Sequence, residues 1–120
     1  FAWDVSAGQG ITIAILDTGV EASHPDLVSN LVPGWNVVSN NSDTSPVRWH
    51  GTSVAGVAAA TGNNGLGVSS VAWDSRIMPV RVTNRTDGVA EWRDLASGIL
   101  WAADHGADEV NISYDVAIGA

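Results

Sequence analysis

Two short segments of the sequence carry side chains suited to proton transfer. Asp17 stands directly after the apolar run 11–16, and His50 opens the segment His-Gly-Thr-Ser-Val-Ala-Gly at 50–56. A carboxylate that holds one ring nitrogen of a histidine leaves the other nitrogen free to take a proton from a nucleophile. Asp17 and His50 together therefore predict two-thirds of a hydrolytic triad, in the order Asp then His.

The local setting of each residue is consistent with this chemistry. The small residues after His50 predict a closely packed helix, so the histidine stands at a helix N-terminus. The positive end of the helix dipole disfavours a protonated imidazole there, and a neutral ring is what a general base requires. Taken alone, Asp17-Thr18-Gly19 is typical of an ordinary turn. The two segments together are more specific than either one.

Alternating strands and helices are expected to position these residues. The apolar patterns predict strands at 11–16, 34–38, 76–82 and 109–114, and helices at 54–60 and 91–105. Strands that alternate with helices favour an α/β fold, a mostly parallel sheet with helices on both faces. Function in such sheets gathers beyond the carboxyl ends of the strands, where Asp17 lies. Pro79 argues against a central position for the strand 76–82.

Length and composition restrict the class of protein. The chain has 120 residues, 45% of them apolar, which suits one globular domain spanning residues 1–120. Its net charge is −8 at pH 7 and all five of its cations are arginines, so we expect no nucleic-acid partner. No apolar run approaches the length of a membrane span, and we expect no membrane partner. The absence of cysteine excludes disulfides and cysteine nucleophiles.

The motifs resemble those of one enzyme family. The resemblance rests on residues 13–20 (Ile-Ala-Ile-Leu-Asp-Thr-Gly-Val), 24–27 (His-Pro-Asp-Leu), 50–56, 63–67, 78–82 and 110–114. Together they are similar to the subtilisin-like serine proteases (subtilases), in particular the thermitase-like branch. The resemblance implies a secreted endopeptidase that cleaves polypeptides, with Asp17 and His50 as the triad acid and base. It also implies that Ser113, Tyr114 and Asp115 line the substrate groove.

The sequence departs from the family pattern in ways that bear on activity. It contains no Gly-Thr-Ser-Met-Ala type segment, which carries the nucleophilic serine in the family, and Ser53 belongs to the histidine's own helix. The chain therefore resembles the first half of a catalytic domain. We expect it to be inactive alone and to associate with the missing C-terminal half or with itself. Asp115 replaces a groove-lining glycine, and Trp49 replaces a small residue and is expected to crowd the cleft.

The resemblance also implies a structural calcium ion. The family's strong calcium site combines the aspartate of His-Pro-Asp-Leu with a glycine-rich loop. Carried over to this chain, the ligands are Asp26, the side chain of Asn64 and the carbonyl oxygens of Thr61, Leu66 and Val68. A solvated loop without an ion is the alternative, because the family's N-terminal ligand is missing.

Two other functions compete with the serine-protease interpretation. Asp17-Thr18-Gly19 also occurs in aspartic proteases, in which small chains dimerise to share a pair of aspartates. Those proteins are nearly all-β, whereas residues 54–60 and 91–105 indicate helices. The second alternative is a non-catalytic binding module that keeps the protease scaffold.

Overall fold

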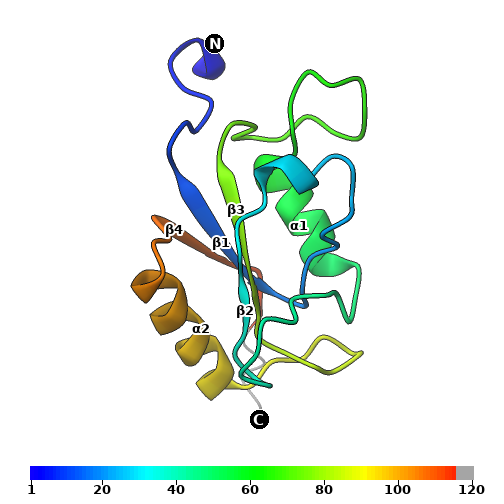
Figure 1. The fold of residues 1–120 in the computed structure, drawn as a ribbon, viewed down its shortest axis with the longest axis vertical. Coiled ribbons are helices and arrows are strands. Elements are labelled where there is room, and N and C mark those ends of the chain that lie inside the picture. The colour runs from blue at the N-terminus through cyan, green and yellow to red at the C-terminus, as the bar shows by residue number, and fades with distance from the viewer. Residues whose placement is uncertain (116–120) are drawn as a thin grey trace.

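The computed structural model describes residues 1–115 and contains one parallel sheet with a helix on each face (Figure 1). The elements are the 3-10 turn Ala2–Asp4, β1 (Thr12–Asp17), the 3-10 turn Val28–Asn30, β2 (Trp35–Asn36), α1 (His50–Ala59), β3 (Arg76–Arg81), α2 (Trp92–Asp104) and β4 (Glu109–Ile112). The strand order is β2-β3-β1-β4. This arrangement confirms the predicted α/β class.

Strand β1 lies inside the sheet and divides the core into two layers. Its side chains alternate, as the two-residue period of a strand requires. Ile13 and Ile15 pack in the layer beneath α1, while Ala14 and Leu16 pack in the layer beneath α2. Residues 13–17 are all at least nine-tenths buried, which explains why this run is apolar without alternating polar positions.

Small residues let the helices approach the sheet closely. Gly98 of α2 faces Leu16 and Val82, and a Cβ added at Gly98 would lie 2.9 Å from Cγ1 of Val82. In α1, Ala55 and Ala59 are fully buried against the opposite layer. The alanine-rich composition of the first helix is therefore a packing requirement.

Pro79 lies on an interior strand, contrary to the expectation from its missing N–H. Strand β3 pairs with β1 along all six residues of β3, but with β2 only at Val80 and Arg81. The carbonyl groups of Ile77 and Arg81 face the β2 side, and Pro79 shares their orientation because alternate strand residues do. On that side Gly34 lies against the carbonyl of Pro79, just before β2 begins. The proline therefore interrupts no regular ladder.

The other expected elements are present with altered ends. Strand β2 covers only two residues, because Asn36 forms an antiparallel bridge with Asn41 and the chain turns back. Strand β4 ends at Ile112 instead of residue 114. Neither helix of the described residues is long and apolar enough to span a membrane.

Candidate active site

Asp17 and His50 meet at the carboxyl edge of the sheet. Asp17 is the last residue of β1 and is fully buried, and His50 is the first residue of α1. Nδ1 of His50 lies 2.9 Å from both carboxylate oxygens of Asp17. An ionised carboxylate only accepts hydrogen bonds, so Nδ1 carries the proton and a neutral ring keeps a free lone pair on Nε2. The predicted geometry of the pair is confirmed.

Neighbouring groups fix this pair in position. The N–H of Thr18 donates to Oδ1 of Asp17 at 2.7 Å, which orients the carboxylate. The Thr18 hydroxyl accepts from the N–H of Gly51 at 3.1 Å and donates to the carbonyl oxygen of Arg48 at 3.1 Å. One side chain thus joins the end of β1 to the segments on both sides of His50.

The start of α1 also depends on close backbone contact. A Cβ added at Gly51 would lie 2.2 Å from the carbonyl oxygen of Gly19 and 3.2 Å from Cβ of Asp17. Only glycine allows the helix to begin this near the strand end. The pairing of Asp17 with His50 therefore requires the residue that follows the histidine to be small.

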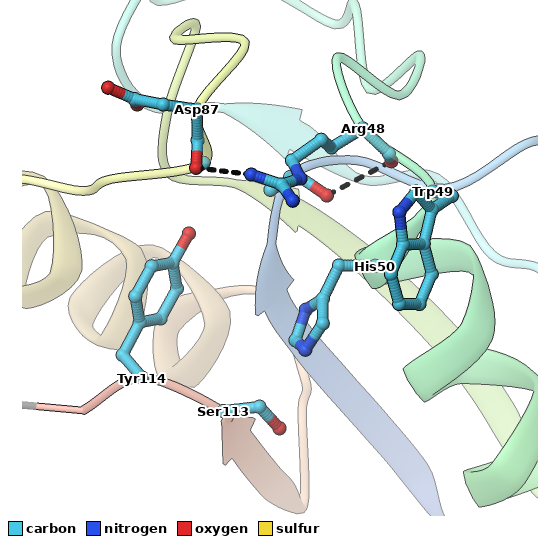
Figure 2. A pocket seen from close by; sticks show the side chains of 8 residues that line it. Arg48, Trp49, His50, Asp87, Ser113 and Tyr114 are labelled. Atoms are coloured by element: carbon cyan, nitrogen blue, oxygen red, sulfur yellow. Dashed lines mark hydrogen bonds between the residues drawn. The ribbon is translucent and has the colours of Figure 1, made fainter.

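A cavity of about 190 Å³ opens beside the imidazole (Figure 2). Its lining residues are Thr18, Arg48, Trp49, His50, Asp87, Gly88, Ser113 and Tyr114. The Trp49 ring is 67% exposed and lies edge-on to the His50 ring, with centroids 5.9 Å apart. The tryptophan therefore walls the cavity without covering the histidine.

The three residues expected in the substrate groove separate into two places. Ser113 and Tyr114 line the cavity beside His50. Asp115 lines a second, larger and mostly apolar cavity of about 390 Å³, which Tyr114 also borders. Tyr114 thus forms a wall between the two cavities. Its pKa is raised to about 12 by burial and, secondarily, by the charge of Asp17, so the phenol keeps its proton.

No hydroxyl of residues 1–115 hydrogen-bonds to Nε2 of His50. The only described side-chain partner of the ring is Asp17, which contacts Nδ1. Ser113 lines the same cavity but forms no hydrogen bond with the Asp17–His50 pair. Sequence reasoning missed four residues that line this cavity, Thr18, Arg48, Asp87 and Gly88. Thr18 could have been identified from its position inside Asp17-Thr18-Gly19. The role of Arg48 could not, because it depends on a loop that is distant in sequence.

Residues of the predicted calcium site lie near Asp26, which is 2% exposed, and their described contacts with it and with one another are made by N–H groups. Its Oδ1 accepts from the Asn64 amide at 2.7 Å, and its Oδ2 accepts from the N–H of Val68 at 3.0 Å. The hydrogen bond from Asn64, followed by that from Val68, lowers the pKa of Asp26 below its ordinary value of 3.8. The backbone of Thr61 joins the group by donating to the Asp26 carbonyl at 2.8 Å, and the N–H of Leu66 donates to Asn64 Oδ1 at 3.1 Å.

The residue types of this loop suit calcium, but both carboxylate oxygens of Asp26 accept hydrogen bonds from N–H groups and the loop is poor in charge. A Cβ at Gly67 would lie 2.0 Å from Oδ2 of Asp26, so the loop is wrapped tightly around the carboxylate. Carboxylate, amide and carbonyl oxygens are the ligands that calcium prefers. Asp26 is the only carboxylate among the five predicted ligands, and residues 1–115 contain no cluster of three acidic, histidine or cysteine side chains suited to a metal.

Comparison with known proteins gives a consistent set of relatives. A family model described as "Subtilase family" matches residues 8–116. Thermitase from Thermoactinomyces vulgaris is 42% identical over 118 residues, which make up 98% of this chain and 42% of thermitase. A thermophilic serine proteinase from Bacillus sp. (strain AK1) is 43% identical, over 94% of this chain and 28% of the relative.

Solved structures agree with the sequence comparison. A protease from Pseudoalteromonas arctica superimposes with a TM-score of 0.86 at 34% identity, over 94% of this chain and 43% of that one. The chain thus spans less than half the length of these relatives. More distant relatives are named as extracellular proteases and as intracellular ones.

Proposed function

The chain belongs to the subtilase family, and from this premise we propose that it supplies the acid and the base of a serine endopeptidase. Asp17 is the acid, His50 is the base, and the substrate is a polypeptide. The nucleophilic serine comes from the remainder of the catalytic domain. The observation that carries the proposal is the contact of His50 Nδ1 with the buried carboxylate of Asp17 at 2.9 Å.

The proposed mechanism follows from the tautomer that this contact imposes. Nε2 of His50 takes the proton of the serine hydroxyl as the oxygen attacks the scissile carbonyl carbon. Asp17 stabilises the imidazolium formed in this step, and His50 then gives the proton to the leaving amine. Thr18 keeps the carboxylate oriented throughout, because its N–H donates to Oδ1 of Asp17.

The alternative of an aspartic-protease dimer fits the fold poorly. Helices α1 and α2 cover both faces of a parallel sheet, whereas that class is nearly all-β. Asp17 is also engaged by His50 and is fully buried, so it does not face an aspartate from a second chain.

The test uses the complete protein that contains this chain. We expect it to react with a fluorophosphonate probe for activated serines and to cleave a fluorogenic peptide. Asp17→Asn and His50→Ala should each lower kcat by a factor of about 10⁴ or more while circular dichroism stays unchanged. Asp104→Asn, an exposed change on α2, is the matched control. A folded protein that neither reacts nor cleaves would instead support the binding-module alternative.

We further propose that the loop 61–68 binds one structural calcium ion weakly. Asp26, the Asn64 side chain and the carbonyl oxygens of Thr61, Leu66 and Val68 would hold it. The ion would supply positive charge to the buried carboxylate and fix the loop. The single carboxylate limits the expected affinity, since calcium sites gain strength from ligand charge.

The remaining proposals concern partners and location. Among the described residues β4 pairs only with β1, and Val110 and Ile112 on it are 38% and 40% exposed. We propose that the C-terminal half of the catalytic domain covers this edge, or a second copy where that half is absent. We also propose secretion, as the thermitase-like resemblance implies.

A further inference from the structure

The cavity beside His50 has an unusual distribution of charge. Arg48, Asp87 and Gly88 are among its lining residues. Tyr114 faces Arg48 and Asp87 from across the cavity (Figure 2). Because His50 itself lines the cavity, a group of the substrate that enters it must lie within a residue or two of the scissile bond.

Arg48 brings a positive charge to the cavity, on which the described charge of Asp87 acts only from beyond ion-pair distance. Its Nη1 donates to the backbone carbonyl of Asp87 at 2.6 Å. No described carboxylate lies within ion-pair distance of it. The carboxylate of Asp87 pairs with Arg85, and its pKa is lowered to about 2 by hydrogen bonds from Arg85 and the Val89 N–H and, to a smaller extent, by the charges of Arg85 and Arg48. The carboxylate of Asp17 pairs with His50. A guanidinium has five N–H donors, so most of those on Arg48 remain for another partner.

Tyr114 adds a second unused donor. Its hydroxyl points toward the wall formed by Arg48 and Asp87. The oxygen is buried and has no hydrogen-bond partner among the residues that the structure describes. A buried hydroxyl without a partner is costly, so an acceptor that reaches it would gain binding free energy.

We propose that this cavity selects substrates with a glutamate or aspartate side chain within two residues of the scissile bond, bound by Arg48 and Tyr114. The inference rests on the proposed endopeptidase function and names its substrate class. A carboxylate accepts several hydrogen bonds at once and suits the planar guanidinium. The neutral phenol of Tyr114 supplies a further hydrogen-bond donor and carries no negative charge that would compete with the substrate carboxylate for Arg48.

The overall charge of the chain acts in the opposite direction. At −8, the chain repels acidic peptides at long range, an effect that salt screens. Selectivity must therefore be measured as a ratio between matched peptides, and its dependence on Arg48 isolates the contribution of the cavity.

The experiment compares kcat/KM of the complete protein on peptides with blocked ends that differ at one position, Glu, Gln or Lys. Each of the two positions before and the two positions after the scissile bond is varied in turn. At one of them we expect Glu to exceed Gln by about tenfold and Lys by more. Arg48→Gln should bring the Glu/Gln ratio to about one, Arg48→Lys should retain part of it, and Tyr114→Phe should reduce it by roughly threefold. Arg93→Gln, exposed on α2 and outside the cavity, is the matched control and should leave the ratio unchanged.

The outcomes separate this inference from the function on which it rests. Efficient cleavage with a Glu/Gln ratio near one at every position, or a ratio that survives Arg48→Gln, would overturn the inference and leave the endopeptidase function standing. A folded protein that cleaves none of the peptides and does not react with the serine probe would refute both.

Discussion

The hydroxyl of Thr18 accepts a hydrogen bond from the N–H of Gly51 at 3.1 Å, across 33 positions of sequence. The same hydroxyl donates to the carbonyl oxygen of Arg48 at 3.1 Å. The end of β1 and the start of α1 are thereby connected by a side chain that touches neither ring nitrogen of His50. The Thr18 hydroxyl therefore holds in place the backbone on both sides of His50, including that of Arg48.

Thr18→Val should remove the hydrogen bonds of the Thr18 hydroxyl to Arg48 and Gly51 while nearly preserving the shape of the side chain. The variant leaves the buried N–H of Gly51 without its acceptor, so we expect the free energy of unfolding to fall by about 1–3 kcal/mol. We also expect kcat to fall more than KM rises, because the base loses alignment. Thr18→Ser keeps a hydroxyl and should recover most of both quantities. Urea denaturation and peptide kinetics measure the two effects, and Thr86→Val in an exposed loop is the control. Equal losses of stability and kcat in the Ser and Val variants would contradict this role of the Thr18 hydroxyl.

Gly51→Ala and Gly56→Ala form a matched pair within α1. The first places a methyl group 2.2 Å from the Gly19 carbonyl oxygen, whereas the second meets only Cγ2 of Val68 at 3.9 Å. We expect Gly51→Ala to destabilise by more than about 2 kcal/mol, since the helix start must move. Gly56→Ala should stabilise by roughly 0.5–1 kcal/mol, because alanine loses less backbone entropy in a helix. Thermal unfolding distinguishes the two, and a neutral Gly51→Ala would refute the close approach.

Much of the fold and half of the site followed from local sequence patterns. Strand β1 was predictable because a strand buried on both faces must be apolar throughout, and Asp17 was predictable because it follows that strand. His50 was predictable because the small residues after it indicate a tightly packed helix. These features are encoded by neighbours in sequence, and so they can be identified without a structure.

The features that sequence reasoning missed depend on contacts between distant segments. Nothing near Arg48 indicates that its guanidinium reaches the Asp87 carbonyl, 39 positions away. Pro79 was misjudged for the same reason, because its missing N–H matters only if a partner strand faces it. The short extent of β2 follows from the bridge of Asn36 to Asn41, which no apolar pattern indicates.

Calcium should stabilise the complete protein if the loop 61–68 is a site. By mass action, the melting temperature should rise with calcium concentration and fall when a chelator is added. Asp26→Ala should abolish this response, whereas Asp104→Ala, on the exposed face of α2, should keep it. Differential scanning fluorimetry over a calcium series provides the measurement. Identical melting curves with calcium and with chelator in the parent protein would show that the loop functions without an ion.

Asp26 should also make stability depend on pH in chelator. Its folded pKa lies below the ordinary value of 3.8 because the Asn64 amide and the Val68 N–H donate to the ionised form. Its contribution is therefore fully present above pH 3.8 and is lost as pH falls through the lower folded value. The advantage of the parent over Asp26→Asn in urea denaturation should be largest near pH 6 and shrink toward pH 3. An advantage that is constant over this range would contradict the role of the ionised carboxylate.

The exposed edge of β4 should make the 120-residue chain associate when it is produced alone. Val110 and Ile112 are partly exposed there, and unpaired strand edges bind other strands unless charge or a covering segment prevents it. We expect size-exclusion chromatography with light scattering to give masses above the 12.4 kDa monomer as concentration rises. Val110→Lys should restore the monomer, while Val71→Lys, an equally apolar but distant exposed position, should not. The chain alone should leave a fluorogenic peptide intact, because no described hydroxyl hydrogen-bonds to His50. Adding the C-terminal half of the domain should remove the association and start cleavage. A monomer at high concentration that hydrolyses the peptide unaided would contradict both expectations and require a different nucleophile.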